Sequence, residues 1–199
     1  ACVKTYVIQY NKNCNTAEIE YETETRVVGE ALGKLPTATR EGYLFKGWYT
    51  LAQGGEKVTV NTVVASNVTY YAQWEAYSYT IIYNANGGTG TTSNTTCKYD
   101  EDVTLRANGF TAPEGFTFKE WNTLANGTGT GYQPADTVKN LTNKQSGIVN
   151  LYAIWEDRTA PGKEAPTAVS TTNTITVTCN QTDKGTGIDK TTIEYSINI

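Results

Sequence analysis

The sequence predicts a mainly β protein, of the β-rich α+β kind, in which one small unit is repeated. Aromatic and β-branched residues bounded by glycine favour a strand, and such a stretch at residues 42–50 returns at residues 115–123. The same offset of 73 residues takes Tyr6 to Tyr79 and Tyr10 to Tyr83. Tyrosine, with 14 copies, is by far the commonest aromatic residue, and it suits thin sheets because its ring is buried while its hydroxyl stays in water. A match at one offset over so long a stretch indicates an internal repeat.

The first strand of each unit is expected at residues 4–10 and 78–83. Their alternating pattern places every second residue on one face, so Tyr6, Ile8 and Tyr10 are expected in a core. Each strand is followed by an Asn- and Gly-rich stretch, at 11–15 and 84–90. Such residues favour the positive φ angles of a hairpin turn.

Residues 18–26 have a glutamate at every second position from 18 to 24, which predicts one strand with four carboxylates on one face and Ile19 and Tyr21 on the other. One interpretation is a docking strip for a basic partner or for cations. The other is a solvated, mutually repelling face that discourages edge-to-edge aggregation, and it is favoured because the second unit has no such strip. The candidate partner-binding residues are Glu18, Glu20, Glu22 and Glu24.

A short helical turn is expected in residues 28–36, ended by Gly33 and Pro36. Closing strands are expected at 69–74 and 150–155. Trp74 and Trp155 are 81 residues apart, so the second unit carries an insertion of eight residues between Ala125 and Leu151.

The expected domains are residues 1–75, 76–157 and 158–199. The first two are joined by residues 75–78, too short for a free tether. A Pro-containing polar linker follows at 156–166. Beyond it, residues 172–178 and 193–197 alternate as strands.

Composition argues against several classes of function. A net charge of −4 and the lack of a basic cluster disfavour binding to nucleic acid or to an anionic membrane surface. No run approaches the roughly 18 apolar residues of a membrane span. The N-terminus is no signal peptide, and with no methionine the chain is expected to be processed or excised. The chain has no histidine, so the usual general base and the Ser-His-Asp and Cys-His pairs are missing. We therefore expect no enzyme and no catalytic residue.

Other chemistry-bearing residues have structural interpretations. The four cysteines, Cys2, Cys14, Cys97 and Cys179, lack metal-ligand spacing and are expected as free thiols. No metal and no cofactor is predicted. Residues 100–102 form the densest acidic cluster and are interpreted as a solvated turn in preference to a glycosidase carboxylate pair. Trp48 and Trp121 are interpreted as core residues in preference to sugar-stacking platforms.

Several motifs carry a family resemblance: Tyr-x-Ile-x-Tyr-Asn-x-Asn at residues 6–13, the run at 35–50, Gly54-Gly55, and Tyr-Ala-Gln-Trp at 71–74. Together they closely resemble the internalin-type B repeat, also called the Listeria–Bacteroides repeat. Residues 3–75 match strongly and 78–156 more loosely, with departures at residues 108–110 and at Glu120, which replaces Gly47. The resemblance implies two small β-grasp-like (ubiquitin- or SUMO-like) units of the kind found in tandem on bacterial surface proteins, without catalytic residues.

The C-terminal strands resemble the opening of a bacterial Ig-like or fibronectin-III-like module. Such a sandwich needs about 100 residues, so a partial module is expected. The function expected from these resemblances is a non-catalytic repeat region of an extracellular, Gram-positive cell-surface protein that mediates adhesion or protein interaction. The partner would be a protein or glycan on a host or neighbouring cell, and the chain a monomer within a longer protein. The alternatives are a structural spacer and a carbohydrate-binding accessory module.

Overall fold

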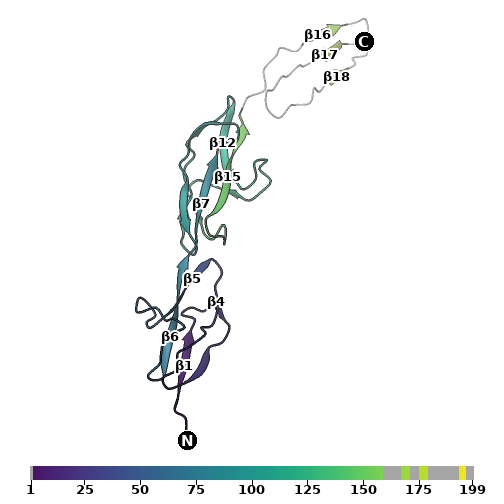
Figure 1. Ribbon diagram of the computed structural model, residues 1–199. Helices are drawn as coiled ribbons and strands as arrows, with labels where there is room; N and C mark the ends of the chain where they lie inside the picture. Colours follow the sequence, from purple (N-terminus) through teal and green to yellow (C-terminus); the bar gives the residue numbers. More distant parts are fainter. Residues whose placement is uncertain (1, 159–166, 171–174, 179–192, 196–199) are drawn as a thin grey trace. The chain divides into compact units, whose positions relative to one another are not determined.

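The computed structural model describes residues 2–158, 167–170, 175–178 and 193–195. All the regular secondary structure in these residues is β strand (Figure 1), which confirms the mainly β class. The helical turn expected at residues 28–36 is wrong. The backbone N–H groups of Leu32 and Gly33 donate instead to the carbonyls of Thr62 and Val60, so these two donors pair across the repeat and are not used in a helix.

The first repeat is built on a four-stranded sheet with the order β3-β1-β6-β5. β1 (Thr5–Asn11) pairs antiparallel with β3 (Thr23–Val27) and parallel with β6 (Val68–Ala76). β6 pairs antiparallel with β5 (Tyr43–Tyr49). Having the first and last strands as parallel neighbours is typical of a β-grasp sheet. A two-stranded sheet is formed by β2 (Glu18–Ile19) and β4 (Ala38–Thr39).

The second repeat has the same strand order with one strand added. Its sheet runs β13-β12-β15-β7-β9, and two small sheets pair β8 with β11 and β10 with β14. The strands are β7 (Ser78–Asn84), β8 (Thr89–Gly90), β9 (Thr95–Lys98), β10 (Val103–Thr104), β11 (Phe110–Thr111), β12 (Phe116–Asn122), β13 (Gly131–Tyr132), β14 (Thr137–Val138) and β15 (Gly147–Asp157). The added edge strand, β13, lies in the region where the sequence predicted an insertion.

The C-terminal part contributes a three-stranded antiparallel sheet of β16 (Thr167–Ser170), β17 (Ile175–Thr178) and β18 (Ile193–Tyr195). Two of these strands fall within the ranges expected at 172–178 and 193–197. The kinship with an Ig-like module stays a prediction.

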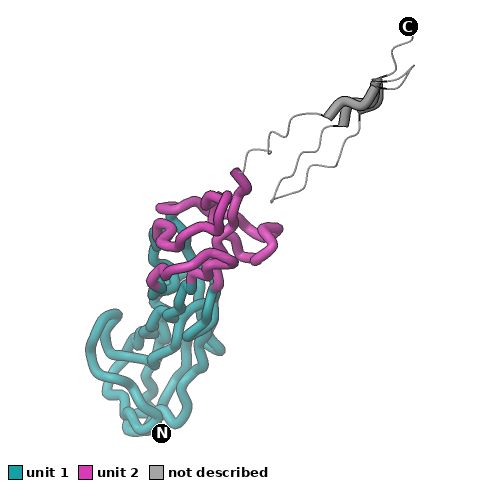
Figure 2. Tube along the Cα trace, turned by 90° about the horizontal axis from the view of Figure 1, so that it is seen from above, with its two compact units in different colours: residues 1–82, 94–105, 137–149 teal, residues 83–93, 106–136, 150–199 magenta. Residues whose placement is uncertain are grey.

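Contacts along the chain define two compact units (Figure 2). The first comprises residues 1–82, 94–105 and 137–149, and the second residues 83–93, 106–136 and 150–199. This grouping places parts of the second repeat in both units. The domain boundaries expected from the sequence, after residues 75 and 157, stay predictions.

Each repeat has a core centred on one tryptophan. Trp48 is 1% exposed and Trp121 0% exposed. Tyr10 lies 4.9 Å from Trp48, and Tyr83 lies 4.8 Å from Trp121, between ring centroids. The indole N–H of Trp48 donates to the Pro36 carbonyl at 2.9 Å. The core interpretation of both tryptophans is therefore confirmed, and neither ring has a face free to stack on a sugar.

Candidate functional site

The four glutamates of the predicted acidic strip do not share one strand. The stretch divides into β2 and β3, with a bend at residues 20–22 between them. The division arises because β2 pairs with β4 while β3 pairs with β1, in a different sheet. The single strand expected at 18–26 is therefore wrong, and the role of its glutamates in binding stays a prediction.

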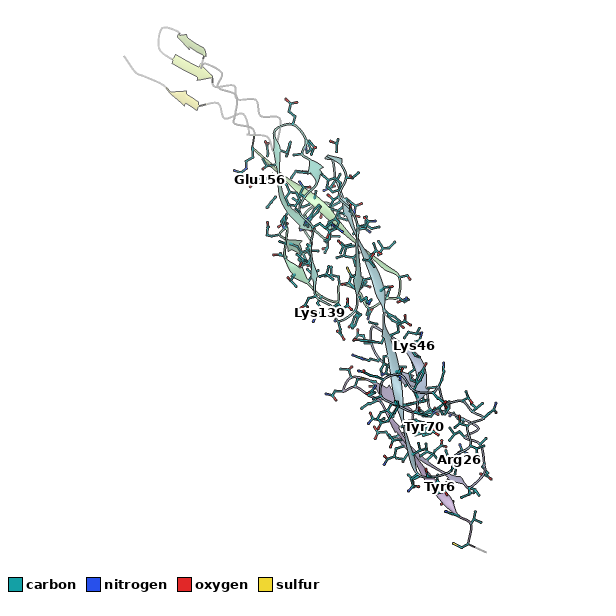
Figure 3. The ribbon with its side chains drawn as sticks, turned by 90° about the vertical axis from the view of Figure 1, so that its left-hand side faces the viewer. Tyr6, Arg26, Lys46, Tyr70, Lys139 and Glu156 are labelled. Carbon is teal, nitrogen blue, oxygen red and sulfur yellow. The ribbon has the colours of Figure 1, made fainter. Side chains whose placement is uncertain are left out.

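Two of these glutamates are occupied by neighbours within the first repeat. Glu24 accepts a hydrogen bond from the Tyr10 hydroxyl at 2.6 Å and pairs with Arg26, also at 2.6 Å. Its side chain is only 14% exposed. Figure 3 shows Arg26 near Tyr6, its register partner on β1. Burial and the bond to Glu24 together raise the pKa of Tyr10 well above its usual range. Glu24 thus acts as a structural residue of the sheet.

Glu20 is bound on the surface by Lys34, and the backbone N–H of Thr37 also donates to it, at 3.3 Å. The hydrogen bond from Lys34 lowers the pKa of the Glu20 carboxyl, and the Thr37 bond adds to the effect. Glu18 and Glu22 are exposed, and neither belongs to an ion pair among the residues that the structure describes. These two carboxylates are the members of the strip best placed to meet a partner.

A network of polar contacts surrounds Asp100, which the sequence analysis interpreted as part of a solvated turn. Asp100 has a left-handed φ of 64°, and its backbone N–H donates to Oδ1 of Asn140 at 2.6 Å. Its carboxylate accepts from Nδ2 of Asn140 and from the Tyr43 hydroxyl, each at 2.8 Å. The guanidinium of Arg40 lies 3.5 Å away. We call Arg40, Tyr43, Tyr99, Asp100 and Asn140 the Asp100 cluster, all of it within the first compact unit.

Aromatic contacts complete the Asp100 cluster. The Arg40 guanidinium lies 3.5 Å from the centroid of the Tyr43 ring, and Tyr43 meets Tyr99 edge-on at 5.9 Å. Gly42 has a φ of 74°, and a Cβ there would lie 2.2 Å from the Tyr99 ring, so only glycine fits this approach. Hydrogen bonds from Asn140, then Tyr43, lower the pKa of Asp100. The carboxylate therefore stays ionised at neutral pH and is unsuited to act as a general acid.

Sequence reasoning missed this cluster because its members come from three distant stretches, near residues 40, 100 and 140. The acidic run at 100–102 was visible, but nothing in the sequence indicated that Asp100 has an arginine and a tyrosine as neighbours. The solvated-turn interpretation is confirmed, since residues 100–102 are exposed and Asp100 lies in a turn, but it missed the partners of Asp100. Glu101 and Asp102 are exposed and pair with Lys98 and Lys139 on the surface.

The insertion in the second repeat is held by Asn122, which is 1% exposed. Its amide donates to the side chain of Glu120 and to the carbonyls of Gly127 and Gly129. Its oxygen accepts from the backbone N–H groups of Leu124 and Gly129. Asn122 thus satisfies its own polar atoms while ordering the loop that leads into β13.

The part of the chain that the structure describes contains three cysteines. Cys2, Cys14 and Cys97 are free there, while Cys179 lies outside the described residues. No three Cys, Asp or Glu side chains of this part gather closely enough to hold a metal ion. The same residues contain no helix of the length and hydrophobicity that crossing a membrane requires.

Comparison with known proteins matches the two repeats to one family. The family model described as the Listeria-Bacteroides repeat domain matches residues 6–73 and again residues 79–154. This chain belongs to the Listeria–Bacteroides repeat family. The two matched segments coincide with the two sheets whose strand orders correspond, which confirms the resemblance seen in the motifs.

Relatives of this Listeria–Bacteroides repeat chain come from two bacteria. Internalin H of Listeria monocytogenes is 33% identical over 159 residues, which is 78% of this chain and 26% of that protein. A protein of Evansella cellulosilytica, provisionally named a membrane protein, is 29% identical over 161 residues, or 79% of this chain and 23% of that protein. A second Evansella protein, provisionally named a Gly-rich membrane protein, is 33% identical over 128 residues. The chain thus spans about a quarter or less of these relatives.

Proposed function

We propose that this chain is a non-catalytic repeat region of a bacterial cell-surface protein and that it mediates adhesion or protein interaction. The observation that carries the proposal is the pair of Listeria–Bacteroides repeats, shared over most of the chain with Internalin H. An extracellular location at a Gram-positive cell wall is part of the proposal, and the similarity to Internalin H of Listeria monocytogenes supports it.

The geometry of the repeats supports a binding role better than a catalytic one. Trp48 and Trp121 are buried in the cores, and the ionised Asp100 already accepts hydrogen bonds from Asn140 and Tyr43 and pairs with Arg40. The exposed carboxylates of Glu18 and Glu22 remain available. They suit a protein or glycan that presents basic groups, since complementary charge steers association.

Binding of the fluorescently labelled chain to intact epithelial cells and to a glycan array tests this proposal. We expect saturable, salt-sensitive binding that the double change Glu18→Lys with Glu22→Lys reduces at least tenfold. The matched control changes two other exposed glutamates, Glu56→Lys with Glu114→Lys, and alters the net charge equally. Equal losses in both variants would mean that net charge acts, and would reject the strip as the binding surface.

A structural spacer is the second candidate function. The Asp100 cluster favours it, because the hydrogen bonds and the ion pair of this cluster join residues from both repeats. A chain that binds no cell and no glycan in the same assays, while remaining folded by circular dichroism, would support the spacer function over adhesion.

A further inference from the structure

The two repeats begin with equivalent turns. The backbone N–H of Val28 donates to the Lys4 carbonyl at 3.1 Å, and the N–H of Tyr99 donates to the Tyr77 carbonyl at 2.8 Å. The next residue in each turn is left-handed, with φ of 85° at Gly29 and 64° at Asp100. Val28 therefore corresponds to Tyr99. We call this turn, together with the residues directly ahead of the first strand, the leading end of a repeat.

Each repeat also has a glycine turn that holds the chain leaving its last strand, and we call it the trailing turn. In the first repeat the Gly42 carbonyl accepts from the N–H of Tyr77 at 2.8 Å. In the second the Gly115 carbonyl accepts from the N–H of Arg158, also at 2.8 Å. Both glycines have a left-handed φ, 74° and 82°. The trailing turn is thus a constant element of the repeat.

The leading end of the second repeat is covered by a trailing turn. Tyr99 contacts Gly42 and the Tyr43 ring, and Asp100 binds Tyr43 and Arg40. These residues all belong to the first compact unit. Docking a trailing turn on a leading end is therefore a contact that this chain already makes once.

The leading end of the first repeat is apolar and open. Val28, which corresponds to Tyr99, is 45% exposed, and Val3, just ahead of β1, is 61% exposed. Val3 corresponds to Ala76, whose register partner in the covered case is Tyr43. At these two positions the first repeat presents apolar side chains to water where the second repeat has contacts.

We propose that the leading end of the first repeat is a docking surface for the trailing turn of another Listeria–Bacteroides repeat joined directly ahead of it. The equivalent end of the second repeat carries such an occupant, and the relatives are about four times as long as the matched region or longer. With Gly29 in place of Asp100, this contact has no carboxylate for an arginine. It is an apolar contact of a tyrosine or phenylalanine ring with Val28.

A three-repeat chain tests the proposal. Residues 2–76 are copied and joined to Lys4 of the complete chain, so that Ala76 takes the place of Val3 and Lys4 follows it at the position that Tyr77 has in the native junction. The comparison chain carries ten Gly and Ser residues at the new junction. The chain without these added residues is called the direct chain. We expect the NMR signals of the Val28 methyl groups and the Gly29 amide behind the new junction to shift from their positions in the original chain, and to do so in the direct chain only. We also expect the distribution of spin-label distances across the new junction to be at least twofold narrower in the direct chain.

Val28→Glu in the direct chain should return both readouts to those of the comparison chain. The matched control is Val60→Glu, at a valine of the same repeat that is also 45% exposed, and it should change neither readout. Identical Val28 signals in the direct and comparison chains would overturn the proposal, as would an equal effect of both variants. A concentration-dependent dimer of the original chain that Val28→Glu abolishes would replace it with docking between molecules.

Discussion

The two repeats share a hydrogen-bonded frame although much of their surface differs. Asn13 donates to the carbonyls of Ala52 and Ala72, and Asn86 donates to those of Ala125 and Ala153, the corresponding residues. Trp74 likewise donates to the Lys12 carbonyl and Trp155 to that of Ala85. In both repeats a few side chains that donate to backbone carbonyls hold the fold, and the rest of the surface is free to vary.

The repeats also differ in the residue at a bulge that both have in the strand carrying the central tryptophan. In β5 the register shifts between Phe45 and Gly47, and in β12 between Phe118 and Glu120. Gly47 adopts a φ of 122°, beside the Lys57 side chain. Glu120 instead offers its carboxylate to Asn122. Both repeats have the bulge, so it belongs to the fold. The residue at the bulge differs, and in β12 it accepts a hydrogen bond from Asn122, which orders the neighbouring loop.

The largest expected effect tests whether the two cores are equivalent. Trp48→Ala and Trp121→Ala should each lower the free energy of unfolding by about 3–5 kcal/mol, because both rings are fully buried. Urea unfolding followed by NMR signals from each repeat measures the two losses separately. The corresponding Trp→Phe variants keep most of the ring and should lose less. A small loss at only one tryptophan would show that the cores are not equivalent.

The next effect belongs to the second repeat alone. Asn122→Ala leaves several backbone groups of the insertion loop without partners and should cost about 2–3 kcal/mol. Hydrogen exchange should accelerate across residues 123–131. Tyr49 occupies the equivalent position in the first repeat, where no comparable network is built, so Tyr49→Ala should cost about half as much. Equal losses would mean that Asn122 contributes packing only.

A smaller effect distinguishes the two bulges. Gly47→Ala forces a side chain into a conformation that glycine alone adopts easily, at a cost of about 1–3 kcal/mol. Glu120→Ala introduces no such strain, since Glu120 already has a side chain and its φ is not positive. Glu120→Ala should therefore lower the thermal unfolding temperature of the full chain less than Gly47→Ala does. The reverse order would locate the strain in β12.

The smallest expected effect is a dependence of stability on pH, which comes from Asp100 in the leading end of the second repeat. The folded-state pKa of Asp100 lies below its ordinary value near 3.9, because Asn140 and Tyr43 donate to the carboxylate. The stability that it contributes is fully present above that value and is lost as the pH falls through the folded pKa. Asp100→Asn should therefore flatten the fall in unfolding temperature below about pH 4. An unchanged acid profile would show that the carboxylate is replaceable.

Sequence periodicity predicted the elements that depend on local pattern. Aromatic and β-branched residues bounded by glycine located the strands around Trp48 and Trp121. Alternation located β1 and β7, because burying every second residue on one face requires that pattern whatever surrounds it. It failed at residues 18–26, where the alternation is real but the chain bends between two sheets. The helical turn that Gly33 and Pro36 suggested at residues 28–36 also failed, because the backbone donors of Leu32 and Gly33 are used by a distant segment near Thr62.

The sequence by itself determined that there are two copies of one β unit, each with its own tryptophan core, because repetition and burial are both recorded in the order of side chains. Only the tertiary structure decided which polar groups are free. Glu24 is bound by Tyr10 and Arg26. Asp100 is bound by residues up to 60 positions away along the chain. The physical reason is that hydrogen bonds and ion pairs join groups that meet in space, and the separation of two residues along the chain does not set that distance.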